Sequence, residues 1–238
     1  MSVKICGVSS KSVCELKGIA AGDELLKING NEIMDVLDYD FYMTEQNLTL
    51  TFKCKDGKYK VIKTDSTDCG LQFETYLMDK QHHCKNKCIF CFIDQLPKGL
   101  RPSLYFKDDD SRLSFLFGNY ITLTGLCERE VQRIIDMHIS PVNISVHTMN
   151  PDLRVKMLKN PKAARLPEIM QKLHDNGIIM NCQIVLCPGY NDGEELTYTI
   201  SELYKMRECV KSLSVVPIGL TRHREGLCPM EAVNHEKA

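Results

Sequence analysis

The segment His82-His83-Cys84-Lys85-Asn86-Lys87-Cys88-Ile89-Phe90-Cys91 carries three cysteines at spacings of four and then three residues. Three thiolates at these spacings can point into one small loop and hold a metal centre. A structural zinc site normally closes a tetrahedron with a fourth protein ligand, whereas an iron-sulfur cubane held by three cysteines leaves one iron open. The segment therefore predicts a metal centre at Cys84, Cys88 and Cys91.

Zinc is the alternative occupant of the same three cysteines, with His82 or His83 as the fourth ligand. The chemistry permits this arrangement, but the segment lacks the paired CxxC or HxxxH spacing of most zinc sites. The cluster interpretation is therefore preferred, and the zinc interpretation stays open.

Cysteine is unusually frequent, at 12 of 238 residues. The N-terminus has no basic segment followed by an apolar stretch, so no secretory signal is evident and a reducing, cytoplasmic location is expected. Disulfides are then not expected. The nine cysteines outside the triplet share no ligand spacing and most are predicted to be small buried hydrophobes: Cys6, Cys14, Cys54, Cys69, Cys127, Cys182, Cys187, Cys209 and Cys228.

Charge and hydropathy argue against two classes of partner. Thirty basic and 31 acidic side chains give a net charge of -1, so no polyelectrolyte field indicates nucleic acid. The longest apolar run, 88–93, has six residues, and a membrane span needs roughly 18. No membrane partner is expected.

The pattern of apolar and polar residues changes along the chain. Apolar and polar residues alternate in 47–63 around an Asp-Gly turn, which predicts a hairpin. Further along, strands are expected near 75–82, 119–124, 142–147, 179–186 and 212–218, with helices between them that begin near Glu128, Pro151 and Asp192. This alternation predicts an α/β fold with a parallel sheet. The acidic run 108–110 is expected to be a solvated loop, in which Arg112 pairs with one of the acids.

The cysteine triplet, with the aromatic Phe90 before its last member, resembles the CxxxCxxC signature of the radical S-adenosylmethionine (SAM) superfamily. The resemblance implies a [4Fe-4S] cluster at Cys84, Cys88 and Cys91 whose open iron binds S-adenosylmethionine. It implies that one electron cleaves this cofactor to methionine and a 5′-deoxyadenosyl radical, which abstracts a substrate hydrogen. An external electron donor of the flavodoxin or ferredoxin type is then required.

Six further residues are implied as cofactor-binding by the same resemblance. Thr124 and Gly125 end a segment, GNYITLTG, that would approach the methionine end of the cofactor. Ser145 and His147 share one face of the strand NISVHT by the period of two and suit the ribose or substrate side of a cavity. Gln183 and Gly189 belong to QIVLCPGYND, which would lie near the adenine. The alternative for Ser145 and His147 is a structural role, as buried polar side chains whose hydrogen bonds are satisfied within the core.

Residues 18–33 resemble the bacterial form of PDZ domains, in their Gly-Asp and Ile-Asn-Gly elements. With the later motifs, the order is similar to a bacterial family of uncharacterised iron-sulfur oxidoreductases that joins a PDZ-like domain, a radical SAM domain and a C-terminal domain of unknown function. This implies a PDZ-like domain at 1–70 and a partial (β/α)6 radical SAM barrel at 71–238, incomplete at its C-terminus and without the last domain. Docking on its own catalytic domain is favoured for the PDZ-like module over peptide capture.

Two functions follow from these observations. The first is a radical SAM enzyme of unknown substrate, with no catalytic residue assigned. The second is a metal-stabilised PDZ-type adaptor, with zinc or a silent cluster at the triplet and no catalysis. No motif identifies a small molecule, an RNA or a peptide as the substrate.

Overall fold

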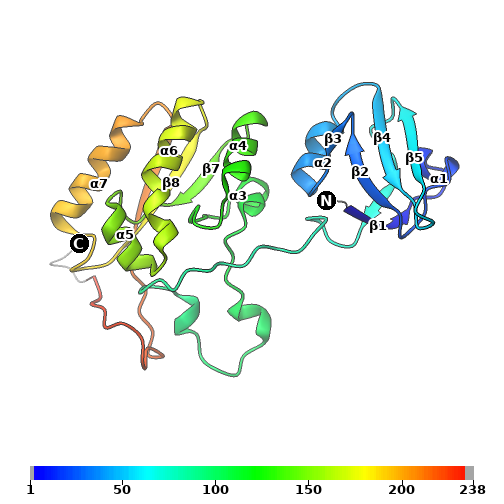
Figure 1. Cartoon of the computed structure of the whole chain (residues 1–238). Coiled ribbons are helices and arrows are strands. Elements are labelled where there is room, and N and C mark those ends of the chain that lie inside the picture. The colour runs from blue at the N-terminus through cyan, green and yellow to red at the C-terminus, as the bar shows by residue number, and fades with distance from the viewer. Residues whose placement is uncertain (1–2, 234–238) are drawn as a thin grey trace. The chain divides into compact units, whose positions relative to one another are not determined.

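The computed structural model describes residues 3–233 and divides the chain into two compact units, Met1–Gln81 and His82–Ala238 (Figure 1). Among the described residues, no helix is long and apolar enough to cross a bilayer.

The N-terminal unit is built on an antiparallel sheet in the order β5-β4-β2-β1-β6, with β3 paired to β2. Its core contains the inward residues of β2 and β4, among them Leu25, Ile28, Leu50 and Phe52. The strands are β1 (Val3–Val8), β2 (Glu24–Ile28), β3 (Asn31–Glu32), β4 (Leu48–Lys53), β5 (Tyr59–Thr64) and β6 (Leu71–Phe73), and the helices are α1 (Val13–Leu16) and α2 (Val36–Tyr42).

Two predictions within this unit are confirmed. The hairpin of 47–63 is β4 and β5, paired in continuous register from Leu48 opposite Thr64 to Lys53 opposite Tyr59. The turns of 18–33 also form. Gly22, Asn29 and Gly30 all have positive φ, a conformation that glycine and asparagine adopt at low cost.

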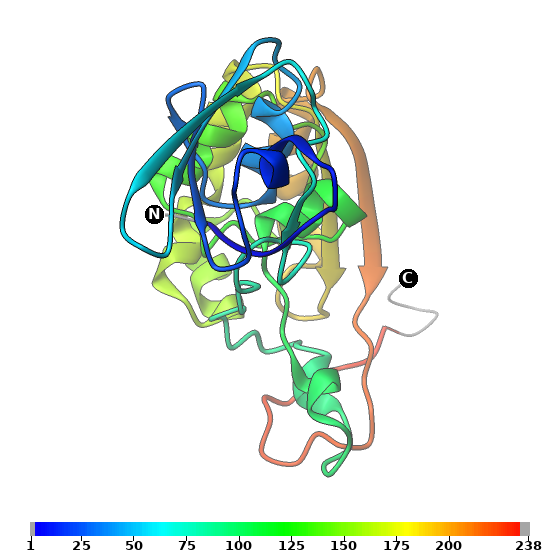
Figure 2. The same cartoon turned by 90° about the vertical axis from the view of Figure 1, so that its right-hand side faces the viewer.

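The C-terminal unit contains a parallel sheet in the order β7-β8-β9, and within 3–233 this sheet is open. Figures 1 and 2 show α5 and α6 on one of its faces. The elements are α3 (Ser111–Phe117), α4 (Glu128–Asp136), β7 (Val142–Ser145), α5 (Pro151–Leu158), α6 (Leu166–Asp175), β8 (Met180–Leu186), α7 (Gly193–Lys205) and β9 (Val210–Pro217), with 3-10 turns η1 (Ile93–Gln95), η2 (Pro102–Tyr105) and η3 (Pro161–Arg165). A mixed α/β fold is thus confirmed.

Two of the five expected strands do not form. Residues 75–82 turn instead, because Met78 has φ of +67° and its amide donates to the carbonyl of Thr75. The segment 119–124 makes a single parallel bridge, from Ile121 to Ile144. Leu123 then adopts φ of +62°, which ends extended pairing. The three strands near 142–147, 179–186 and 212–218 are confirmed as β7, β8 and β9.

The predicted helix starts are largely confirmed. Asn150 caps α5 by accepting hydrogen bonds from the amides of Asp152 and Leu153. Helix α7 follows Asp192, but the expected capping box is wrong because the Asp192 carboxylate accepts from Gly189. Glu195 instead accepts a hydrogen bond from Thr148 at 2.6 Å. The α7 N-terminus is therefore tied to the loop after β7.

The two faces of the parallel sheet differ in chemistry. Side chains facing the helices are apolar and buried, including Ile144, Met180, Cys182 and Ile184. The alternate positions are polar and align across the three strands: Asn143 with Asn181 and Ser212, then Ser145 with Gln183 and Ser214. Asn181 donates to the Asn143 side chain at 3.0 Å and accepts from Ser212 at 2.9 Å. Asn143 is buried and bonded to Ser114 of α3, whereas Ser145 and Gln183 are half-buried and Ser214 is exposed, so the second row is the part of this face that a polar ligand can reach.

Ile144 is completely buried at the centre of this sheet, and we expect Ile144→Ala to lower the free energy of unfolding by about 2–5 kcal/mol because it leaves a cavity. The matched control is Val215→Ala on β9, a side chain that is 41% exposed, for which the loss is below about 1 kcal/mol. Urea denaturation measures both. Equal losses for the two variants would contradict this description of the core.

Candidate metal and cofactor site

The cysteine loop is anchored to the C-terminal end of α5. The amide of Lys87 donates to the carbonyl of Leu158, and the amide of Ile89 to the carbonyl of Met157. Ile89 and Phe90 are buried in one hydrophobic cluster with residues of α5 and of the loops after β8 and β9. The packing of Ile89 and Phe90 fixes the loop that carries the half-buried cysteines, which would lower the cost of ordering the thiols around a metal.

The three thiols of the loop are half-buried and influence one another. Burial, then the charges of Cys84 and Cys91, raise the pKa of Cys88 to about 12, and burial also raises the pKa of Cys84. Three neighbouring thiols therefore do not ionise together without a compensating cation. This is the behaviour expected of a donor set that binds a metal centre and releases protons as it does so.

Asn86 lies between the first two cysteines and is almost fully buried. Its amide nitrogen donates to Cys84 Sγ at 3.4 Å and to Thr122 Oγ1 at 2.9 Å. Its carbonyl oxygen accepts from Thr124 Oγ1 at 3.0 Å and from Asn160 Nδ2 at 2.6 Å. One side chain thus joins the first cysteine to the loop before α4 and to the start of η3.

Arg154 supplies a buried positive charge beneath the same loop and is 1% exposed. Its guanidinium donates to four backbone carbonyls, those of Thr122, Ser145, Val146 and Ala163, at 2.8–2.9 Å. Burial lowers the pKa of Arg154 to about 10, and the charges of Cys88 and Asp109 oppose this. The guanidinium therefore stays charged at neutral pH and stabilises anions at the cysteine loop.

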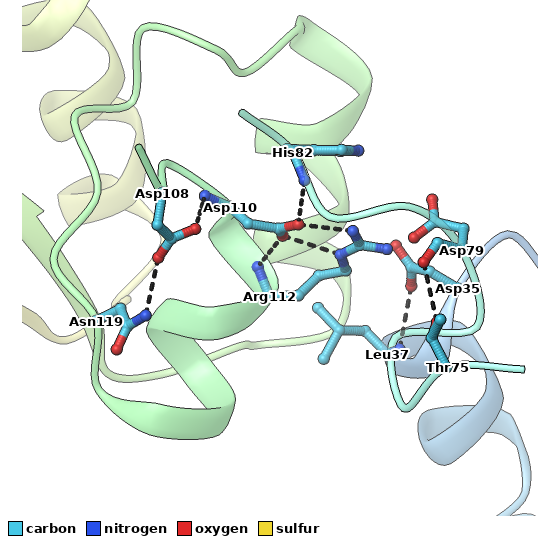
Figure 3. A network of polar contacts seen from close by, with 9 residues as sticks. All are labelled: Asp35, Leu37, Thr75, Asp79, His82, Asp108, Asp110, Arg112 and Asn119. Carbon is cyan, nitrogen blue, oxygen red and sulfur yellow. Dashed lines mark hydrogen bonds and ion pairs between the residues drawn. The ribbon is translucent and has the colours of Figure 1, made fainter. Parts of the chain in front are cut away.

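The acidic run 108–110 is not the solvated loop that the sequence predicts. Asp110 is fully buried and accepts from the His82 amide at 2.8 Å and from Arg112 Nε and Nη2 at 2.9 and 2.6 Å (Figure 3). The expected pairing of Arg112 is thereby confirmed. Burial opposes ionisation of Asp110, but the hydrogen bonds from Arg112 and His82 hold its pKa below the usual value. Asp110 thus anchors the backbone at the start of the cysteine loop.

Asp109 has a separate role in that turn. Its carboxylate accepts from both the amide and the hydroxyl of Thr122, each at 2.6 Å. Burial raises the pKa of Asp109, and the hydrogen bonds from Thr122 oppose the rise. Because Thr122 also contacts Asn86, the acidic turn and the cysteine loop belong to one hydrogen-bonded network.

Among the residues predicted to bind the cofactor, Thr124 lies in this network. It is buried and hydrogen-bonded to Asn86. Gly125 is exposed, and a side chain at this position would meet Asp109 Oδ2 at 4.0 Å. Gly189 is exposed with φ of +77° and open space around it. A ligand can therefore approach the backbone at both glycines.

Ser145 and Gln183 are half-buried neighbours on the polar face of the sheet. His147 is not on that face as the period of two predicts, because β7 ends at Ser145 and His147 has φ of +63°. Its ring lies 4.6 Å from that of Phe90, and its Nδ1 accepts from the Val185 amide at 3.2 Å. His147 thus packs beneath the cysteine loop.

The remaining side chains near the triplet are more exposed. His82 and His83 are exposed, and the ring of His83 lies edge-on to Phe106 at 5.2 Å. Within 3–233, no three His, Cys, Asp or Glu side chains are grouped to hold a single metal ion. A cubane attaches each thiolate to a different iron, so its ligands do not converge on one point. Outside the triplet, five of the nine cysteines are buried, as predicted: Cys14, Cys69, Cys182, Cys187 and Cys209.

Comparison with protein families identifies a Radical SAM-like domain over residues 63–213, more than half of the chain. The chain belongs to this family. The match includes the cysteine loop, the network around Asn86, strands β7 and β8 and the first part of β9. No curated protein matches the chain.

Several residues of the radical SAM-like site carry no distinctive sequence signal. Asn86 is one polar residue among the lysines of a loop, and Arg154 is one of two basic residues in its helix. Their burial follows from tertiary packing, which the sequence pattern does not display. The polar row on β8 does have a sequence signal, because Asn181 and Gln183 alternate with buried apolar residues at the period of two.

We expect Asn86→Ala to lower the free energy of unfolding by about 1–3 kcal/mol, because Thr124 and Asn160 lose their shared acceptor. The control is Lys87→Ala, an exposed neighbour whose loss is within about 0.5 kcal/mol. Chemical denaturation with the thiols kept reduced makes the comparison. If both variants match the wild type, the network is not a structural support.

Burial, aided by the charge of Arg154, lowers the pKa of His147 to about 3 in the folded chain. In the unfolded chain His147 binds a proton as the pH falls through about 6.5, whereas in the folded chain it stays neutral over this range. The contribution of His147 to the free energy of unfolding is therefore fully present above about pH 6.5 and is lost as the pH falls below it. We expect His147 to cost about 1.4 kcal/mol of stability per pH unit between pH 6 and 4. Urea titrations across this range should give a shallower pH dependence for His147→Gln than for the wild type. Parallel slopes would place a protonatable, solvated imidazole at this position.

Proposed function

We propose that this protein binds a [4Fe-4S] cluster at Cys84, Cys88 and Cys91 and cleaves S-adenosylmethionine reductively. The observation that carries the proposal is the cysteine loop of a radical SAM-like domain, packed at the end of a parallel sheet with its three thiols close enough to affect one another's ionisation. When bound, the cluster and cofactor supply an electron transfer that yields methionine and a 5′-deoxyadenosyl radical for hydrogen abstraction.

The chain's own residues support this donor set in three ways. The amide of Asn86 orients the Cys84 sulfur and donates to it, which favours the thiolate. The charge of Arg154 offsets the negative charge of the thiolates. Phe90 is 9% exposed and covers the loop from the core side, which limits water access. Phe92, at 56% exposure, does not add to that cover.

The cofactor itself is proposed to lie along the edge where the strands end. Thr124 and Gly125 would face its methionine end, and Ser145, Gln183 and Gly189 its ribose and adenine. Support comes from the polar row on β7, β8 and β9, because hydroxyl and amide groups there suit a nucleoside. His147 would act indirectly, by packing against the ring of Phe90 and holding it in place. A partial (β/α)6 barrel, with the PDZ-like module docked on it or binding a peptide, remains part of the same proposal.

Anaerobic reconstitution with iron and sulfide tests the function. We expect about four iron atoms per chain, and 5′-deoxyadenosine when S-adenosylmethionine and dithionite are added. An external one-electron donor of the flavodoxin or ferredoxin type should replace dithionite. The single variants Cys84→Ala, Cys88→Ala and Cys91→Ala should lose both iron and product.

Exposed cysteines outside the triplet give the matched controls, and Cys6→Ala and Cys127→Ala should keep iron and product at wild-type levels. One zinc per chain with no iron, dependent on the same three cysteines, would establish the metal-stabilised adaptor instead. Iron without 5′-deoxyadenosine would leave a cluster protein and refute the cleavage reaction.

A further inference from the structure

A pocket of about 440 Å³ lies beside the third cysteine, between the segment that follows the cysteine loop and the segment that follows β9. Figure 2 shows both segments beyond the carboxyl end of β9, the edge of a parallel sheet at which ligands bind. Ile93, Leu96 and Tyr105 give the pocket apolar walls, and the rest of its lining is polar or charged. Its volume is within the usual range for small-molecule sites.

One buried side chain holds the two walls together. Gln95 is completely buried, and its amide nitrogen donates to the carbonyls of Cys91 and Gly219 at 3.3 and 3.2 Å. Its side-chain oxygen accepts from the Thr221 amide at 3.1 Å, and its backbone carbonyl accepts from the Thr221 hydroxyl at 2.8 Å. The pocket is therefore a built feature of the fold, fixed to the cysteine loop through Cys91.

The charges of the pocket do not cancel. Lys107 and Asp94 form an ion pair at 2.7 Å and neutralise each other. Lys98 and Arg222 are then opposed only by Glu225 in the lining. In the part of the chain that the structure describes, the side chains of Lys98 and Arg222 have no hydrogen-bond or ion-pair partner. His223 adds a further donor.

We propose that this pocket binds the substrate, and that the substrate is a small anion carrying phosphate or carboxylate groups. Arg222 and Lys98 hold the anion by charge-assisted hydrogen bonds, and Tyr105 with Leu96 contacts its apolar part. That the ligand is the substrate depends on the proposed function; that the pocket selects anions depends only on its own lining. Gln95, between the lining residues Asp94 and Leu96, donates to the carbonyl of Cys91, so a ligand held in the pocket lies next to the cysteine loop.

Binding of inorganic pyrophosphate and of citrate to the full chain, measured by titration calorimetry, tests the inference. We expect at least one of them to bind, with glycerol as the neutral comparison that does not. Arg222→Gln and Lys98→Gln should each weaken binding about tenfold, and added salt should weaken it further. Glu225→Gln should strengthen binding, which a damaged fold would not do. Lys162→Gln, an exposed lysine on η3 outside the pocket lining, should leave the affinity unchanged.

The two probes distinguish phosphate from carboxylate as the preferred group. Equal affinities in the wild type, Arg222→Gln and Glu225→Gln would overturn the inference, as would the absence of binding by both anions. Iron content and 5′-deoxyadenosine formation, measured separately on wild-type protein, report on the proposed function. If these are present and anion selectivity is absent, only the inference fails. If anions bind but neither iron nor product is found, the assignment of the pocket to a substrate is overturned.

Discussion

The buried guanidinium of Arg154 is the interaction on which the arrangement of the site depends. A permanent charge without water is costly unless each of its donors finds an acceptor, and here backbone carbonyls from three separate segments supply them. The segments must therefore end where the guanidinium can reach them. The same charge favours anions at the cysteine loop, so one residue both shapes the strand ends and sets the local potential.

The polar network next to Arg154 joins elements that are distant in sequence. Asn86, Thr122 and Asp109 come from the cysteine loop, the segment before α4 and the acidic turn, and each makes hydrogen bonds to the next. Buried networks of this kind specify a single arrangement when every member is satisfied. The cysteine loop is thereby held by packing on one side and by polar contacts on the other.

Much of this arrangement was predictable from sequence, and the failures have physical causes. The hairpin β4–β5 and the three parallel strands follow from the period of their apolar residues, because each depends on local pattern, and the cysteine triplet is visible from its spacing. The strand near 75–82 fails because of a backbone reversal at Met78, and the acidic turn was misread because burial of Asp110 requires a partner 28 residues before it, His82. Asn86 and Arg154 act through long-range contacts, to which a single sequence gives no access.

Gln95 has a thermodynamic consequence. It connects the backbone of Cys91 to both walls of the neighbouring pocket, so the pocket and the cysteine loop share one rigid support. If a ligand in the pocket alters the free energy of binding at the cysteines, occupancy of the cysteines must alter the affinity of the pocket by the same factor. Linkage of this kind would make the forms of the protein with and without a ligand at the cysteines differ in how tightly they hold an anion in the pocket.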